Sequence, residues 1–229
     1  AASKDALIKR AYADLIGLPP SYNELNHWRS ISNENWYERL IDDLLQKPAY
    51  GEKLALLWMD LARYADSYGF QDDNIRSQWP WRDWVIHAFN DNLPYDQFLI
   101  NQIAGDLLPN ATKKNILATA FFRNHKFTEE GGVIDEEYRV SYNIDKTRTY
   151  GKAFLGVTIE CAQCHDHKYD PFSNRAYYQL YAFFNESKEK GYEGDVSVST
   201  PAKNPKLFIS AQERNKLLSF INTSDTSQL

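Results

Sequence analysis

The sequence predicts a mainly α-helical protein, an irregular multi-helix domain with a short extended segment near the C-terminus. Three observations support this class. Apolar residues recur at helical spacing through the first two thirds of the chain, and capping residues, glycines and prolines bound those segments. Loops without any sustained period separate several of the helices. The 229 residues are ample for a buried core.

The N-terminal elements have clear local signals. A helix is expected over residues 4–16, and Gly-Leu-Pro-Pro at 17–20 stops it. Ser21, followed three residues later by Glu24, is a capping box that begins a second helix. A third amphipathic stretch occupies residues 33–47 and ends before a proline.

The middle of the chain contains the most apolar helix and the longest loop. The helix is expected over residues 50–66, where we expect the centre of the core. Its apolar side chains are Leu54, Leu57, Trp58, Leu61 and Tyr64. Residues 67–79 have no period and are expected to form a loop. Further helices are expected over residues 80–91, 95–105 and 112–122, and a glycine-containing loop follows them at 123–134.

The last third begins with a long helix over residues 135–155 that leads into a short cysteine-containing segment. Asp170-Pro171 is expected to supply the N-cap and first residue of the next helix. Residues 196–199 and 206–209 are expected to be extended, and a last helix is expected over 211–221. The predicted domains are a helical domain over 1–190 and a C-terminal extension or linker over 191–229.

Composition argues against nucleic-acid binding and against a membrane-spanning helix in this sequence. The formal net charge is -5 and the pI is near 5.6, so no general nucleic-acid footprint is present. No apolar run approaches the roughly 20 residues that span a bilayer, and the first residues lack a signal-peptide core.

The most specific motif is Cys161-Ala-Gln-Cys164-His165, which contains both cysteines of the chain. Cys-x-x-Cys-His is the attachment motif of c-type haem. Two thiols on one short turn bond to the two vinyl groups of one porphyrin, and the adjacent imidazole binds the iron. The sequence therefore predicts one covalent haem c, around which the helical domain folds, with His165 as the proximal ligand.

Other interpretations of the same residues remain open. A thioredoxin-like redox pair would use both cysteines, although no βαβ pattern surrounds them. A zinc site could use Cys161, Cys164, His165 or His167, but no further cysteine exists for a second ligand pair. A disulfide between the cysteines would close a very small loop and stabilise little.

The second face of the iron decides between an electron carrier and a catalyst. His125, in the glycine-containing loop, is the candidate distal ligand, and Met59 or an open position are the alternatives. The predicted metal ligands are thus His165 and His125. His167 is expected beside the haem, bonded to a propionate or facing a substrate.

Other polar residues have candidate roles in the same site. Glu130, Asp166 and His167 are the candidate catalytic acid or base groups. For Glu129, exposure to solvent is a sufficient explanation of a charged residue at this position. For Asp170, a helix N-cap role is sufficient. Arginines that could pair with haem propionates are Arg63, Arg123, Arg139 and Arg148, of which Arg123 and Arg148 are the predicted cofactor contacts. Exposed Trp79, Trp81 or Tyr68 could stack on a sugar, although core packing accounts for most aromatic residues.

Several separate motifs resemble one family. They are Arg10-Ala-Tyr-Ala-Asp-Leu-Ile-Gly-Leu-Pro-Pro, Tyr50-Gly-Glu, Trp58-Met-Asp-Leu-Ala-Arg-Tyr-Ala-Asp-Ser, Arg123-Asn-His through Glu130-Gly-Gly, and Cys161-Ala-Gln-Cys-His-Asp-His-Lys-Tyr-Asp-Pro. Over residues 6–205 the chain resembles the planctomycete cytochrome-c-type domain of unknown function. Departures from the family pattern at Met59, Lys146 and Arg148 leave the cysteines and His165 unchanged.

The resemblance implies haem c in a large exported protein, beside other haem c modules and within systems that degrade polysaccharides. Haem c is attached on the outer side of the bacterial inner membrane, so we expect a periplasmic or otherwise exported location. The predicted function is redox chemistry, as part of a haem-dependent oxidoreductase linked to sugar metabolism. An electron-transfer module with bis-axial ligation and a non-redox carbohydrate-binding scaffold are the alternatives. The expected partners are a neighbouring redox domain or cytochrome and a saccharide substrate.

Overall fold

The protein is described from a computed structural model, which defines residues 2–70, 73–189, 191 and 207–220. The described chain is mainly helical, as predicted, and forms two compact units. Unit 1 comprises Ala1–Asp60 and Arg82–Ile100, and unit 2 comprises Leu61–Trp81 and Asn101–Leu229. The α-helices are α1 (Lys4–Ile16), α2 (Tyr22–Ser30), α3 (Trp36–Leu45), α4 (Pro48–Ala62), α5 (Trp79–Asn90), α6 (Tyr95–Ala104), α7 (Lys113–Ala118), α8 (Asp135–Tyr150), α9 (Asn174–Phe184) and α10 (Ala211–Phe220).

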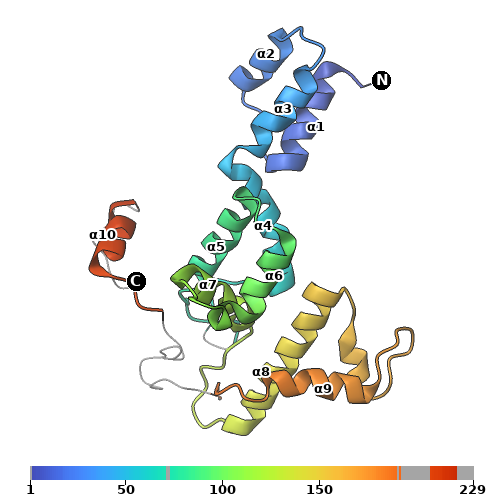
Figure 1. Cartoon of the computed structure of the whole chain (residues 1–229), viewed down its shortest axis with the longest axis vertical. Helices are drawn as coiled ribbons and strands as arrows, with labels where there is room; N and C mark the ends of the chain where they lie inside the picture. The colour runs from blue at the N-terminus through green and yellow to red at the C-terminus, as the bar shows by residue number, and fades with distance from the viewer. Residues whose placement is uncertain (1, 71–72, 190, 192–206, 221–229) are drawn as a thin grey trace. The chain divides into compact units, whose positions relative to one another are not determined.

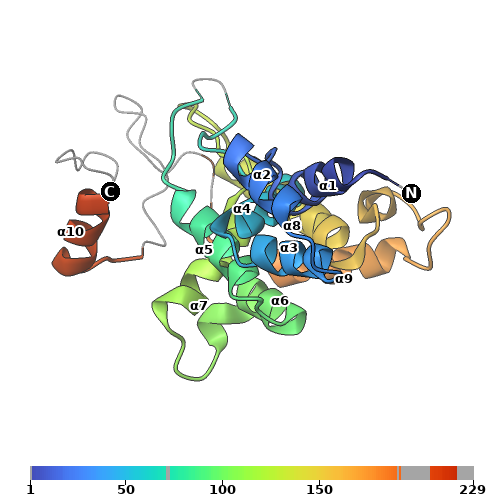
Figure 2. The ribbon, with the colours of Figure 1, turned by 90° about the horizontal axis from the view of Figure 1, so that it is seen from above.

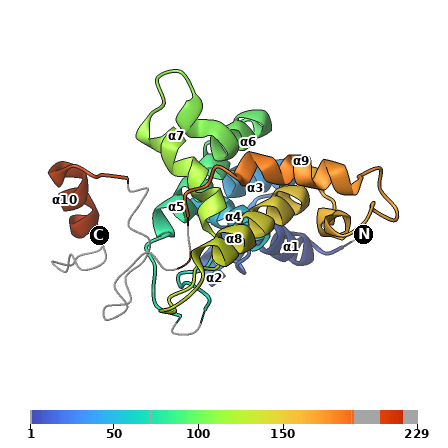
Figure 3. The same cartoon turned by 90° about the horizontal axis from the view of Figure 1, so that it is seen from below.

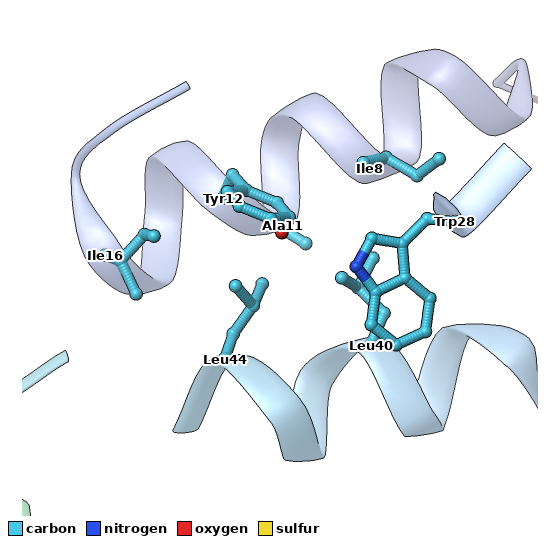
Figure 4. Packing of buried hydrophobic residues seen from close by; sticks show 7 residues of the cluster. All are labelled: Ile8, Ala11, Tyr12, Ile16, Trp28, Leu40 and Leu44. Atoms are coloured by element: carbon cyan, nitrogen blue, oxygen red, sulfur yellow. The ribbon is translucent and has the colours of Figure 1, made fainter. Parts of the chain in front are cut away.

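Unit 1 begins with three helices, α1, α2 and α3, which lie together in Figure 1 and in the view from above in Figure 2. Their apolar faces meet in one core, and Figure 4 shows those side chains facing one another from all three helices. The core residues are Ile8, Ala11, Tyr12, Ile16, Trp28, Leu40 and Leu44. Local amphipathic periodicity therefore becomes a small helical core here.

The predicted capping box of α2 is confirmed. The Ser21 hydroxyl accepts from the Glu24 amide at 3.3 Å, and the Glu24 carboxylate accepts from the Ser21 amide at 2.9 Å. Lys47 binds the same carboxylate at 2.6 Å, and this contact lowers the pKa of Glu24 to about 2. The cap thus also ties α2 to the residues that follow α3.

The apolar helix α4 differs from its prediction. Leu57 is 61% exposed and Leu61 is 44% exposed, whereas Ala55, Trp58 and Ala62 are buried. Within unit 1, Trp58 contacts Phe98 with ring centroids 5.0 Å apart. The expectation that the apolar positions of this helix form the centre of the core is therefore wrong for Leu57 and Leu61, because small and aromatic residues occupy the packed face.

Unit 2 is organised around α8 and α9, which pack on each other and lie side by side in Figure 1 and Figure 3. Short helical turns also belong to unit 2. The turn η2 (Thr119–Arg123) contacts α7 and leads into the loop that ends at residue 134. The turn η3 (Gly151–Leu155) continues α8, and η4 (Ile159–Gln163) contacts both α8 and α9. Ile159, Ala162 and Tyr177 form a buried cluster between η4 and α9. This cluster holds the cysteine segment against the helix pair.

The expected extended segment near the C-terminus falls partly outside the described residues, at 196–199. Residues 207–209 are described and are not in a strand, and the described chain contains a single isolated bridge, between Ser67 and Ile75. The class is therefore all-α. No helix in the described part is long and apolar enough to cross a membrane.

Candidate functional site

The two cysteines lie on an exposed turn that side chains of α9 hold in place. Both Cys161 and Cys164 are exposed free thiols. The side-chain amide of Asn174, in the first turn of α9, donates to the carbonyls of Ala162 and Gln163 at 2.9 Å each. The Tyr178 hydroxyl donates to the same Gln163 carbonyl at 3.1 Å. The thiols are thus exposed to solvent on a turn whose backbone carbonyls are hydrogen-bonded to α9.

His165 follows the turn with its imidazole exposed. Its Nδ1 atom is 2.7 Å from the Asp166 carbonyl oxygen. A carbonyl is only an acceptor, so this contact places the ring proton on Nδ1 and leaves the Nε2 lone pair available. A carbonyl that accepts the proton of one ring nitrogen is a common way in which a protein orients a metal-binding imidazole.

His167 occupies the loop between this turn and α9. Its side chain is 4% exposed, and its Nδ1 atom accepts from the amides of Asp170 at 2.9 Å and Tyr169 at 3.3 Å. The Nε2 atom is buried without a hydrogen-bond partner. In this structure His167 organises the loop, and its expected role toward a propionate or substrate stays a prediction.

The start of α9 corrects one prediction. Ser173 is the N-cap, with its hydroxyl accepting from the Ala176 amide at 3.0 Å, so Asp170-Pro171 is not the cap. The Asp166 carboxylate accepts from the backbone amide of Asn174 at 2.7 Å and so satisfies another free N–H group at the start of the helix. Asp166, a predicted catalytic group, therefore has a structural contact that its position in the sequence did not indicate.

Gly151 sets how closely η4 approaches α8. A Cβ atom at this position would lie 2.4 Å from Cγ2 of Ile159, and the Gly151 carbonyl accepts from the Val157 amide at 3.0 Å. The helix widens here into the π-helical turn η3. This turn is capped by Gly156, which has a φ of +67°. Such π turns are common near functional sites.

Replacing Gly151 with alanine is expected to displace the cysteine turn and to destabilise unit 2 by about 1–3 kcal/mol, because the methyl group overpacks Ile159. Native-state hydrogen exchange of the η4 peptides measures this loss. In the double variant Gly151→Ala/Ile159→Ala the two costs should be less than additive, since the second change removes the clashing side chain. Fully additive losses would contradict the assignment.

Arg148 is the predicted cofactor contact that lies beside the turn. Its NH2 atom donates to the Gln163 side chain at 2.8 Å, and the residue is exposed. Arg63 and Arg139 are bound elsewhere, Arg63 to Asp145 and Arg139 to Glu136 and Asn185. Among these arginines, Arg148 is therefore the one in contact with a residue between the two cysteines.

His125 and Arg123 belong to a second cluster, a buried charged centre that we define as His125, Lys146, Glu189 and Arg123. One Glu189 oxygen binds the Arg123 guanidinium, and the other binds the Lys146 ammonium. The second oxygen also lies 3.3 Å from His125 Nε2, outside hydrogen-bonding geometry. Burial raises the Glu189 pKa, but His125, Lys146 and Arg123 more than offset this and leave the pKa below its ordinary value.

His125 is 2% exposed and its ring is held from several sides. Nδ1 is 2.7 Å from the Lys126 carbonyl, and the ring stacks on Tyr142 with centroids 4.5 Å apart. Arg148, which contacts the cysteine turn, lies six residues beyond Tyr142 on α8, which is a rise of about 9 Å along the helix. No hydrogen bond or ion pair in the described residues joins His125 to the cysteine motif. Its role as distal ligand stays a prediction, and Met59 lies half-buried in unit 1.

The loops around this centre are held by two buried residues. Arg76 is 8% exposed and donates to the carbonyls of Ala65, Arg123, Asn124 and His125 at 2.9–3.3 Å. Glu129 is 7% exposed and accepts from the Asn74 amide at 3.2 Å and from its side chain at 3.1 Å. The solvated role expected for Glu129 is therefore wrong. Together these contacts join the 67–79 loop to the 123–134 loop.

Glu130, the third predicted catalytic group, is half-buried and accepts from the Tyr138 hydroxyl at 3.3 Å. The sugar-stacking expectation fails for two of its three candidates. Trp81 is fully buried and Tyr68 is 7% exposed, and burial raises the pKa of Tyr68 to about 12. Trp79 is half-buried at the start of α5.

No sequence pattern predicts a role for Lys146, Glu189 or Arg76, which complete the charged centre and its supports. Most of their partners are far away in the sequence, at separations of 43 for Lys146 with Glu189, 66 for Arg123 with Glu189 and 49 for Arg76 with His125. No local spacing marks such pairs. The one available signal was the Arg123-Asn124-His125 motif itself.

The residues of the cysteine turn fit a covalent haem. The two thiols are exposed, and the adjacent imidazole is oriented by the Asp166 carbonyl, so the groups that the attachment motif uses are accessible. Exposed apolar side chains of Leu155 and Tyr178 lie on elements that contact η4. The described residues contain no group of three or more His, Cys, Asp or Glu side chains placed to hold a metal ion.

The family model PSCyt2, described as a protein of unknown function (DUF1549), matches residues 1–189. The chain belongs to this family. PSCyt2 is a planctomycete-associated domain family, so the predicted family is confirmed at that level. Neither a curated protein nor a solved structure matches the chain. The PSCyt2 match contains the cysteine turn and the charged centre, and its last residue is Glu189.

Proposed function

We propose that unit 2 is the attachment domain for one haem c, bonded to Cys161 and Cys164 and ligated by His165, and that it acts in redox chemistry in an exported protein. The observation that carries the proposal is the exposed His165 ring, with Nδ1 2.7 Å from the Asp166 carbonyl, directly after two exposed thiols on a braced turn. The thioredoxin and disulfide interpretations assign no role to this imidazole, whereas a zinc ion could use the same exposed Nε2 atom.

When bound, haem c supplies a one-electron carrier whose potential depends on its ligands and surroundings. The chain's own residues hold the site still. Asn174 and Tyr178 fix the carbonyls of the turn, and the Asp166 carbonyl keeps the His165 proton on Nδ1. Arg148 lies within reach of the turn and can pair with an anionic edge of the group.

Exposure of the turn favours electron exchange with a neighbouring redox domain or cytochrome, because electrons pass readily only where a partner can approach closely. An oxidoreductase acting on a saccharide, or a carbohydrate-binding scaffold with a structural haem, would need a substrate surface, which no contact of the described residues identifies. These two alternatives, like the exported location, stay predictions.

The test is production of the full chain together with a haem-attachment machinery, followed by intact mass and reduced-haem spectra. We expect a mass increase of one haem in the wild type and none in Cys161→Ala/Cys164→Ala. His165→Ala should alter the spectrum, whereas His87→Ala, in unit 1, should not. A colourless wild type with two free thiols would refute the proposal.

The same spectra separate carrier from catalyst. Low-spin iron that changes in His125→Ala indicates a second protein ligand and supports a carrier, although ligation by His125 would require its Nε2 atom to move away from Glu189. High-spin iron that binds small anions indicates an open position and supports a catalyst.

A further inference from the structure

The Glu189 carboxylate occupies a site formed by the side chains of Arg123, His125 and Lys146. The residues that carry it, 185–189, follow α9, and we call them the strap. Of the partners, Lys146 projects from α8 with 6% of its side chain exposed, and the His125 side chain is 2% exposed. Burial lowers the Lys146 pKa, although Glu189 opposes the shift.

The backbone that carries Arg123 and His125 is held by contacts that do not involve the strap. The carbonyls of Arg123 and His125 both accept from Arg76 NH1, at 3.3 and 2.9 Å. The His125 ring is also fixed by Tyr142 and by the Lys126 carbonyl. Removing the carboxylate would therefore leave the His125 ring and the Arg123 backbone in place, and the Lys146 ammonium would keep its 3.0 Å contact with the Ser187 hydroxyl.

The arrangement matches a carboxylate in particular. Each Glu189 oxygen has its own cationic donor, Arg123 for one and Lys146 for the other, and the Ser187 hydroxyl lies 3.1 Å from the second oxygen. Paired donors along one edge recognise a planar, two-oxygen anion. With Arg123 and Lys146 against one carboxylate, the centre also has an excess of positive charge.

We infer that His125, Lys146 and Arg123 form a carboxylate-binding site, which the strap fills with Glu189 as a tethered internal ligand. A small molecule bearing a carboxylate binds there by displacing Glu189, so the strap controls access to the site. The inference does not depend on haem. A tethered group has a high effective concentration at its own site, so free carboxylates compete only weakly in the wild type.

Glu189→Ala tests the inference, because it removes the internal ligand and leaves a space the size of a small carboxylic acid. We expect acetate and formate to raise the melting temperature of this variant in a saturable manner, by about 3–5 °C at ten times the Kd. Chloride and inorganic phosphate at equal ionic strength should not do so. If the variant is unfolded alone, acetate should restore its folding.

Matched variants define the site. Glu189→Gln keeps the space filled and should not respond to acetate, and Glu137→Ala removes an exposed carboxylate of α8 and should behave as the wild type. Adding Lys146→Met to Glu189→Ala should abolish the response. The inference is overturned if acetate acts no better than chloride, if phosphate alone stabilises, or if acetate fails to refold an unfolded variant.

Discussion

Replacing Arg76 with methionine is expected to lower the unfolding free energy of unit 2 by about 3–5 kcal/mol. The guanidinium donates to four carbonyls from two separate segments, residue 65 and residues 123–125, while it is 8% exposed. Methionine fills much of the volume but leaves these buried acceptors without donors. Each unsatisfied buried acceptor costs about 1–3 kcal/mol, partly relieved by entering water.

Native-state hydrogen exchange resolved by peptide measures this loss and separates unit 2 from unit 1. Arg76→Lys should lose less, because an ammonium keeps three donors but cannot reach all four carbonyls. Arg175→Met makes the same chemical change at an exposed position of α9 and should stay within about 0.5 kcal/mol of the wild type. Equal losses at both arginines would show that Arg76 does not hold the loops together.

Glu189→Gln is expected to destabilise unit 2 by about 3–5 kcal/mol at neutral pH, because it leaves the buried Lys146 ammonium and the half-buried Arg123 guanidinium without their counter-ion. The folded-state pKa of Glu189 is depressed. Its stabilisation is therefore present above the unfolded pKa, about 4.3, and is lost as the pH falls toward the folded value. The difference in stability between wild type and variant should thus shrink on acidification.

Urea unfolding at a series of pH values measures this difference, with the unit 2 peptides again followed by hydrogen exchange. Taking the difference between the two proteins cancels the other carboxylates that titrate in the same range. A difference that stays constant from neutral to acid pH would mean that the Glu189 charge does not contribute to stability.

Most of the helices follow from local sequence. The predicted 4–16 helix is α1, and the Ser21 capping box begins α2, because helical periodicity and caps depend on residues within one turn of each other. The same locality explains one error. Asp170 and Ser173 are both acceptable caps three residues apart, and the choice of Ser173 goes with Asp166 accepting from the Asn174 amide across the loop.

Burial was predicted less well than helicity. The apolar positions of α4 suggested a central core helix, yet Leu57 and Leu61 are exposed. Glu129, a charged loop residue, is buried instead. Periodicity shows which residues share a face, but only the packing partners decide whether that face meets protein or water.

By itself, the sequence determined the helical class, most of the helix boundaries and the Cys161-x-x-Cys164-His165 motif on which the haem proposal depends. The tertiary structure alone decided that His125 and Arg123 meet Lys146 and Glu189 in a buried charged centre, and that the cysteine turn is braced by α9. The physical reason is range. Helix formation is encoded within a few residues, whereas a charge can be buried only where distant segments supply its partners.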